Sequence, residues 1–179
     1  MSEFKEFAKI ARYSRPIVVT EKIDGTNGLV HVAEDGTVTA GSRSTWITPE
    51  KDNHGFARWV KEHETELRTL GEGYHYGEWW GLGINRGYGM KEKHWSLFNV
   101  SRWKDTRPAC CDVVPVLYEG MMSENQILLA LERLEDQGSV AAPGFKPAEG
   151  VVIYHVQGNL YFKKTILHDE IPKSELKTP

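Results

Sequence analysis

Cysteine is scarce in this sequence, and the two cysteines present are poorly placed for a structural role. Cys110 and Cys111 are neighbours among 179 residues. Neighbouring side chains in an extended segment point to opposite sides, so an internal disulfide is not expected. The sequence also lacks a Cys-x-x-Cys pair, which argues against a structural zinc site. These absences are typical of a protein from a reducing compartment, and we expect a cytoplasmic location.

Several patterns that would define other functions are missing. No apolar run approaches the roughly 18 residues that a membrane helix needs, and the polar start MSEFKEFAKIARYS lacks the apolar core of a signal peptide. The seven histidines form no His-x-x-x-His or His-x-His pair. A Gly-x-x-x-x-Gly-Lys-Ser/Thr loop is absent as well. Neither a membrane partner, nor a zinc enzyme, nor a P-loop kinase is therefore expected.

Charge of one sign is also lacking, because the formal net charge is only -3. The whole molecule is therefore not a basic surface for nucleic acid. Any polyanion that it binds must meet a local patch of lysine and arginine.

Strand patterns dominate what is present. β-Branched and alternating residues predict strands over residues 17–23, 29–32, 37–40, 151–156 and 160–164. The stretch DGTNG over residues 24–28 is turn chemistry, and the Asp-Gly pair at residues 35–36 predicts a hairpin. The sequence thus predicts a strand-rich mixed domain.

Two helices are expected between these strands. Apolar residues at spacings of three and four predict a helix over residues 56–70. A second helix is predicted over residues 124–137, with Ser123 and Gln126 as a capping box and Gly138 at its end. Because no repeat, linker or low-complexity tract interrupts the chain, a single domain over residues 1–179 is expected.

The stretch EKIDGTN, residues 21–27, carries the clearest chemistry. A lysine at a strand end, followed by a tight turn, can hold its amine at the mouth of a pocket. The stretch resembles the nucleophile motif of covalent nucleotidyltransferases, which comprise DNA ligases, RNA ligases and messenger-RNA capping enzymes. Its residue pattern is most similar to that of the RNA ligase 2 branch. Taken alone, Lys22 is equally well explained as a surface lysine beside an ordinary Asp-Gly turn.

Further stretches resemble the other signature elements of that superfamily. They are GSRS at residues 41–44, YGEWWG at 76–81, LFNV at 97–100, EGVV at 149–152 and YFKK at 161–164. Each alone has a simpler explanation, such as an exposed hairpin arginine, a core ring or a solvated strand end. Their joint occurrence in family order, over about 80% of the chain, makes coincidence a poor explanation.

The resemblance implies a role for each element. Lys22 would attack the α-phosphate of ATP and form lysyl-AMP, and Glu149 would help to place the metal and phosphates. Arg43 would contact phosphate, Glu78 the ribose hydroxyl, and Phe98 would stack on the purine. The implied ATP-binding residues are Glu21, Lys22, Asn27, Arg43, Glu78, Phe98, Glu149, Lys163 and Lys164. Those implied to be catalytic are Lys22, Glu149, Lys163 and Lys164.

A magnesium or manganese ion is expected beside the phosphates. Asp24, Asn27 and Glu149 offer hard oxygen ligands that could hold hydrated Mg²⁺, directly or through water. The fifth element departs from the family, which normally has Lys-x-Lys with both amines on one face of a strand. Here the lysines are adjacent, so only one would face the nucleotide unless a bulge turns both inward. Which of Lys163 and Lys164 contacts phosphate stays open.

A basic segment over residues 86–107 is the expected contact with nucleic acid. Its proposed phosphate-binding residues are Arg86, Lys91, Lys93 and Lys104. Interleaved with them are the rings of Tyr88, His94, Trp95 and Trp103. Cations for phosphates and flat rings for bases are typical of nucleic-acid binding. Core tryptophans beside solvated charges explain the pattern equally well.

The resemblance also implies the fold and the overall activity. The fold would be α+β, an ATP-grasp-like nucleotidyltransferase domain of two packed, mostly antiparallel sheets with flanking helices and ATP between the sheets. The activity would be ATP-dependent joining of a 5′-phosphate end of RNA, or alternatively DNA, to a 3′-hydroxyl. Larger members carry a further domain after the fifth element, and an auxiliary protein could replace it.

Two alternatives remain open. A capping-type guanylyltransferase shares the lysine chemistry but forms lysyl-GMP. A non-catalytic protein that binds nucleic-acid ends could keep the same fold without turnover. The presence of Lys22, Glu78 and Glu149 argues against the second alternative.

Overall fold

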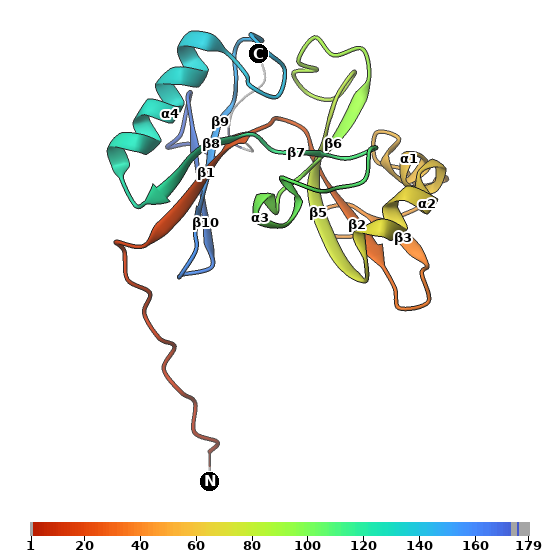
Figure 1. Ribbon diagram of the computed structural model, residues 1–179, viewed down its shortest axis with the longest axis horizontal. Coiled ribbons are helices and arrows are strands. Elements are labelled where there is room, and N and C mark those ends of the chain that lie inside the picture. Colours follow the sequence, from red (N-terminus) through yellow and green to blue (C-terminus); the bar gives the residue numbers. More distant parts are fainter. Residues whose placement is uncertain (1, 173–174, 176–179) are drawn as a thin grey trace.

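Two sheets form two lobes of the protein in the computed structural model, which describes residues 2–172 and residue 175 (Figure 1). The first sheet has the order β10-β9-β1-β8, and all its strands are antiparallel. Its strands are β1 (Pro16–Lys22), β8 (Val116–Met121), β9 (Gly150–His155) and β10 (Leu160–Thr165). The predicted closing hairpin is therefore confirmed, and its outer strand lies at the edge of the sheet.

The second sheet contains six strands in the order β4-β3-β2-β5-β6-β7. They are β2 (Thr26–Val32), β3 (Val38–Gly41), β4 (Trp46–Ile47), β5 (Gly73–Gly81), β6 (Lys93–Leu97) and β7 (Asp112–Val113). All pairs are antiparallel except β6 with β7. The α+β fold of two mostly antiparallel sheets, implied by the resemblance, is confirmed.

Helix α4 (Glu124–Gln137) covers the outer face of the first sheet. Ser123 accepts a hydrogen bond from the backbone N–H of Gln126, and Gly138 ends the helix with a positive φ. Leu131 and Leu134 pack against a buried apolar cluster of β1 and β9. The second predicted helix is thus confirmed to its bounds.

The other predicted helix is broken into three pieces. Residues 56–70 form α1 (Phe56–Glu62), α2 (Glu64–Leu67) and the 3-10 turn η1 (Arg68–Leu70). The break is at His63, whose φ of -105° and ψ of 15° leave the helical region. Its ring nitrogen Nδ1 lies 2.8 Å from the carbonyl oxygen of Trp59, which also receives the backbone N–H of His63. The apolar stripe is nevertheless correct, because Phe56, Val60 and Leu70 are buried.

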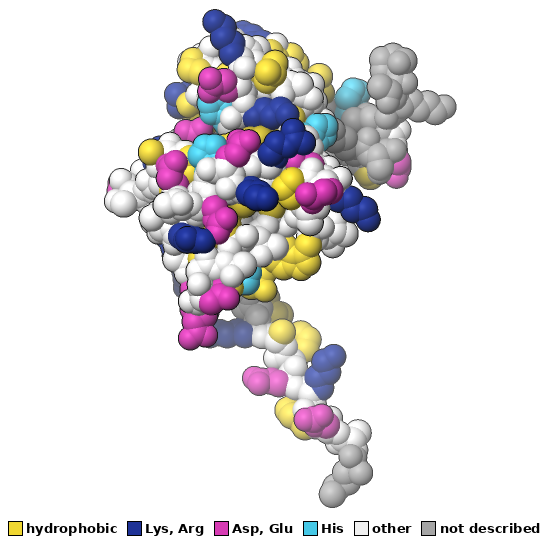
Figure 2. Space-filling view, turned by 90° about the vertical axis from the view of Figure 1, so that its right-hand side faces the viewer, with side chains coloured by type: hydrophobic (Ala, Val, Ile, Leu, Met, Phe, Trp, Pro, Cys, Tyr) yellow, Lys and Arg dark blue, Asp and Glu magenta, His cyan; other side chains and the backbone are white. Residues whose placement is uncertain are grey.

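The face of the second lobe that carries α1 and α2 mixes charges of both signs. Lysine and arginine side chains alternate with aspartate and glutamate over this face (Figure 2). No helix of the described residues is long and apolar enough to cross a membrane.

Candidate functional site

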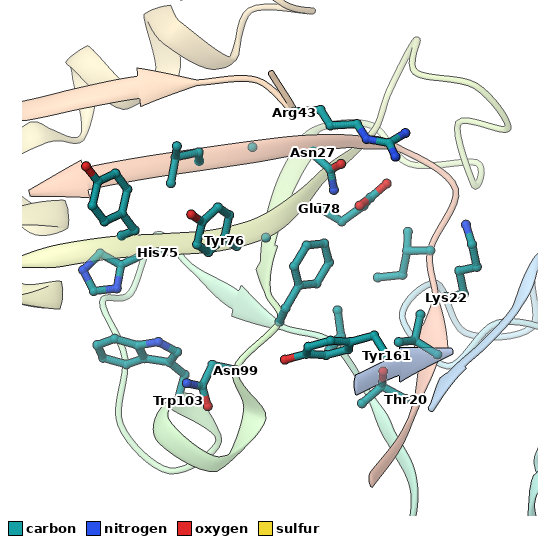
Figure 3. A pocket seen from close by; sticks show the side chains of 18 of the residues that line it. Thr20, Lys22, Asn27, Arg43, His75, Tyr76, Glu78, Asn99, Trp103 and Tyr161 are labelled. Carbon is teal, nitrogen blue, oxygen red and sulfur yellow. The ribbon is translucent and has the colours of Figure 1, made fainter. Parts of the chain in front are cut away.

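A cavity of ≈ 610 Å³ lies between the two sheets. Residues of β1 and β10 form one wall, and residues of β2 and β5 form the other. Figure 3 shows Lys22 at one end of the cavity and His75 and Trp103 at the other. This size is within the range of small-molecule sites, roughly 300 to 1,000 Å³.

Lys22 is the last residue of β1 and reaches into the cavity. Its Nζ lies 2.7 Å from Oε2 of Glu149, with 23% of the Lys22 side chain and 7% of the Glu149 side chain exposed. The backbone brings the two together because Lys22 pairs with Gly150 in the sheet. A Cβ on Gly150 would lie 2.2 Å from the carbonyl oxygen of Lys164, so only glycine permits the close approach of β9 and β10 here.

Glu78 occupies the opposite wall, on β5. Its Oε1 accepts a 3.0 Å hydrogen bond from the backbone N–H of Gly25 in the turn after Lys22. A Cβ on Gly25 would meet the carbonyl oxygen of Trp79 at 2.3 Å, so the turn requires glycine. Burial raises the pKa of Glu78 to about 7, while the nearby charge of Lys22 acts in the opposite direction. The carboxyl of Glu78 is therefore poised to change protonation near neutral pH.

Asp24 does not line the cavity, and its side chain is hydrogen-bonded within the protein. Its side chain accepts hydrogen bonds from Asn85 Nδ2 at 3.0 Å and from Arg86 Nε at 2.9 Å. Its backbone N–H donates to the hydroxyl of Tyr88, whose own pKa is raised by burial. Arg86 also donates to the carbonyl oxygen of Pro147. Asp24 thus ties the turn after Lys22 to residues 85–88, and the Arg86 guanidinium is engaged by Asp24 and the carbonyl oxygen of Pro147.

Three further residues expected around the nucleotide, Asn27, Arg43 and Phe98, line the same cavity. Asn27 lies directly opposite Glu78 in the register of β2 and β5. Arg43 is exposed and points toward the same end of the cavity, and the half-buried Phe98 forms part of the wall between the lobes. The structure therefore brings together Lys22, Asn27, Arg43, Glu78, Phe98 and Glu149 around one space.

The register of the first sheet separates the two lysines of β10. Lys163 pairs with Val152, and Val152 lines the cavity. Directly paired residues share a face of a sheet, so Lys163 lies on the cavity side. Lys164 lies on the other side, where its Nζ is 3.3 Å from Asp169 Oδ2. No bulge interrupts this pairing, so the possibility that both lysines face the nucleotide is wrong for this structure.

Glu21 is fully buried, with 1% of the residue exposed. Its Oε2 accepts hydrogen bonds from the backbone N–H groups of Val140 and Ala141, at 2.8 and 2.9 Å. The residue is part of the cavity wall, but its carboxylate holds the loop after α4 against β1.

The cavity offers few protein ligands for a metal ion. Among residues 2–172 and 175, no group of three or more histidine, cysteine, aspartate or glutamate side chains could hold a metal ion. Glu149 and Asn27 remain suitable oxygen donors, whereas the Asp24 carboxylate is engaged by Asn85 and Arg86. Mg²⁺ is commonly held by one or two carboxylates together with waters and substrate phosphates, and this donor set fits that mode.

Three of the four rings of the basic segment are not available to nucleobases, and the fourth, His94, is half-buried. Tyr88, Trp95 and Trp103 are buried, with between 0% and 8% of each residue exposed. The expectation that these rings contact bases is therefore wrong, because they form the core of the second lobe. Lys93 donates to the carbonyl oxygen of His54. Lys91 and Lys104 are exposed, and their contact with nucleic acid stays a prediction.

Several wall residues were missed from the sequence. Thr20, Tyr74, Tyr76, Val152 and Tyr161 line the cavity without belonging to the residues singled out. Alternation along a strand could have found Thr20, which precedes Lys22 by two positions and so shares its face. Tyr161 could have been found in the same way from Lys163.

Comparison with known proteins identifies the lineage. A family model described as RNA ligase matches residues 15–167. No curated protein matches the sequence. Among solved structures, variants of a Naegleria gruberi RNA ligase are similar in fold, and three of them illustrate the likeness.

Two of these variants were solved with ATP and Mn. One has a TM-score of 0.64 and 20% identity, and the other has a TM-score of 0.63 and 19% identity. Each comparison covers 86% of this chain and 50% of the other chain. An apo variant has a TM-score of 0.62 and 20% identity, over 85% of this chain and 50% of the other. This chain thus spans about half the length of those RNA ligase chains, and the likeness establishes a shared fold.

Proposed function

The chain belongs to the RNA ligase family, and from that premise we propose that it is the nucleotidyltransferase domain of an ATP-dependent RNA ligase. The observation that carries the proposal is the placement of Lys22 against Glu149 at the end of a cavity of suitable size for a nucleotide. The similar Naegleria gruberi RNA ligase has been solved with ATP and Mn, which supports ATP and a divalent metal as the ligands of this cavity.

The first step is transfer of AMP to Lys22. The Nζ of Lys22 attacks the α-phosphorus of ATP, a P–N bond forms, and the bond to the leaving pyrophosphate breaks. The amine must lose a proton to become a nucleophile, and the carboxylate of Glu149, 2.7 Å away, is placed to accept it. The Lys22–Glu149 ion pair must open before the attack.

Two cations on the cavity side are placed to meet the phosphate charge in this step. Arg43 lines the cavity, and Lys163 lies on the cavity side of β10. Basic groups fixed in advance stabilise the charge that grows on the phosphoryl oxygens. A bound Mg²⁺ or Mn²⁺ would add Lewis-acid stabilisation of those oxygens, with Glu149 and Asn27 as its protein ligands, directly or through water.

The base and sugar of ATP occupy the part of the cavity that Glu78 and Phe98 line, next to Lys22. Phe98 stacks on the purine, and the Glu78 carboxylate accepts a hydrogen bond from the ribose hydroxyl. Two later steps complete ligation. AMP passes from Lys22 to the 5′-phosphate of a polynucleotide, and a 3′-hydroxyl then attacks that phosphate and releases AMP. An auxiliary protein would add contacts to the polynucleotide.

The proposal is tested by incubating the protein with each labelled nucleoside triphosphate and Mg²⁺, followed by denaturing gels. We expect an acid-labile, alkali-stable adduct with ATP and not with GTP. Both Lys22→Ala and Lys22→Arg should abolish the adduct, because arginine keeps the charge but cannot become a neutral amine. An adduct with GTP would favour a capping-type guanylyltransferase. An adduct that survives in either variant would exclude Lys22 as the nucleophile.

A further inference from the structure

Three exposed aromatic rings lie on the cavity side of the second sheet. The exposed fractions are 54% for Trp46, 57% for Tyr74 and 56% for Tyr76. His31 connects two of them, with ring centroids 4.4 Å from Tyr74 and 5.9 Å from Trp46. The aromatic strip is defined here as Trp46, His31, Tyr74 and Tyr76.

The strip occupies one face because of the strand register. Tyr74, Tyr76 and Glu78 alternate along β5 with the buried His75 and Trp79. His31 is directly opposite Tyr74 in the β2–β5 pairing, so both residues share the face of Glu78. On the same face, Trp46 pairs with Gly41, which in turn pairs with Leu29 of β2. Rings from β2, β4 and β5 thus form one continuous surface.

This surface continues directly from the nucleotide cavity. Tyr74 and Tyr76 line the same cavity as Lys22 and Phe98, and the backbone N–H of Phe98 donates to the carbonyl oxygen of Tyr76. Arg43 and Arg102, two exposed cations, also line this cavity. Isolated exposed apolar residues are normal, but a continuous exposed aromatic surface usually marks a binding site.

We propose that the aromatic strip is a stacking platform for unpaired bases of the RNA strand whose end reacts at Lys22. The proposal rests on the proposed function for its choice of RNA. Rings displayed on an open sheet face are a recurrent means of binding single-stranded nucleic acid, because every base offers a flat surface for stacking. Arg43 supplies charge complementary to the phosphates, whereas the guanidinium of Arg102 donates to the carbonyl oxygen of Leu70 and lies over the ring of Trp103. Tyr88, Trp95 and Trp103 cannot serve this purpose, because they are buried.

The test compares leucine and phenylalanine replacements in the strip. Trp46→Leu and Tyr74→Leu remove the stacking surface, whereas Trp46→Phe and Tyr74→Phe keep a ring. Phe162→Leu is the matched control, since Phe162 is 53% exposed on β10 and lies on the side opposite Tyr161 and Lys163. Affinity is measured by fluorescence anisotropy with a labelled, 5′-phosphorylated single-stranded RNA in the absence of ATP.

We expect each leucine variant to bind the RNA roughly fivefold or more weakly, since loss of one base–aromatic stack is worth at least that factor. The phenylalanine variants and Phe162→Leu should bind nearly as tightly as wild type. The log-log slope of affinity against salt should not change, because stacking releases no counterions. RNA should also quench part of the tryptophan fluorescence, and that part should be absent in Trp46→Phe.

Two results would overturn the proposal. Leucine variants with wild-type RNA affinity would show that the strip does not bind the RNA. A flatter salt slope in those variants would show that ionic contacts were lost instead of stacking. Adduct formation is measured in parallel for Trp46→Leu, whose ring lies outside the nucleotide cavity. If the wild-type protein itself forms no adduct, the proposed function is refuted. The RNA affinities of the variants would still decide whether the strip binds RNA.

Discussion

Replacement of Glu78 by glutamine should change how the stability of the protein depends on pH. Burial raises the pKa of this carboxyl from 4.5 to about 7 in the folded protein. Between these pH values the folded state keeps a proton that the unfolded state has already lost. Stability therefore falls as the pH rises through this window, and the full cost of the buried charge is present above about pH 7.

The size of the effect follows from the shift in acidity. Each tenfold change in acidity corresponds to about 1.4 kcal/mol, so a pKa raised from 4.5 to about 7 corresponds to a cost on the order of 3 kcal/mol. Glu78→Gln has no titrating group at this position and keeps an oxygen for the N–H of Gly25. The free energy of unfolding of the variant, relative to wild type, should rise by up to that amount across the window.

Urea denaturation at intervals from about pH 4.5 to about pH 8 measures this difference. Titrations shared by wild type and variant cancel in the comparison. Glu72→Gln, which removes an exposed carboxylate just ahead of β5, controls for the loss of one negative charge. A stability difference between Glu78→Gln and wild type that stays constant with pH would refute the reasoning.

Two further predictions concern the proposed nucleotide site. Lys163→Ala should reduce the rate of lysyl-AMP formation by roughly 100-fold, the usual effect of losing one donor to a developing charge, whereas Lys164→Ala should stay near wild type because Lys164 pairs with Asp169. The rates are measured by single-turnover adduct formation. Equal losses of rate in Lys163→Ala and Lys164→Ala would contradict the placement of Lys163 alone on the cavity side. Phe98→Ala should weaken ATP binding by about 1 kcal/mol or more through lost stacking. Complete recovery of stability and ATP affinity in Phe98→Leu, measured by calorimetry, would identify Phe98 as a core ring.

Sequence patterns correctly predicted those helices and strands whose caps, apolar spacing and turns lie within one short segment. Helix α4 was predicted to its bounds because its cap, its apolar stripe and its final glycine all lie within the segment. The same kind of pattern missed the break at His63, because the spacing of apolar residues does not report the backbone angles of one residue, here φ of -105° and ψ of 15°. Strand β8 was also missed. Its exposed and half-buried residues give no clear alternation, and its place is fixed by pairing with β1.

The motifs predicted which residues meet around the cavity, and long-range pairing decides which groups each of them contacts. Asp24 and Arg86 were assigned to a metal and to nucleic acid because of their chemistry, yet they bind each other across 62 positions of the chain. Neither Lys163 nor Lys164 could be preferred until the pairing of β10 with β9 placed one on each face.

The same limit applies to the surface that would hold RNA. Sequence composition drew attention to rings near lysines and arginines, but the tryptophans of residues 86–107 are needed to fill the core of the second lobe. Trp46 and Tyr74 are 28 positions apart and carry no shared motif. They become one surface only because β2, β3, β4 and β5 are neighbours in the sheet and present His31 between the two rings. A binding surface built across strands is therefore determined by sheet order, which the local sequence of each strand does not contain.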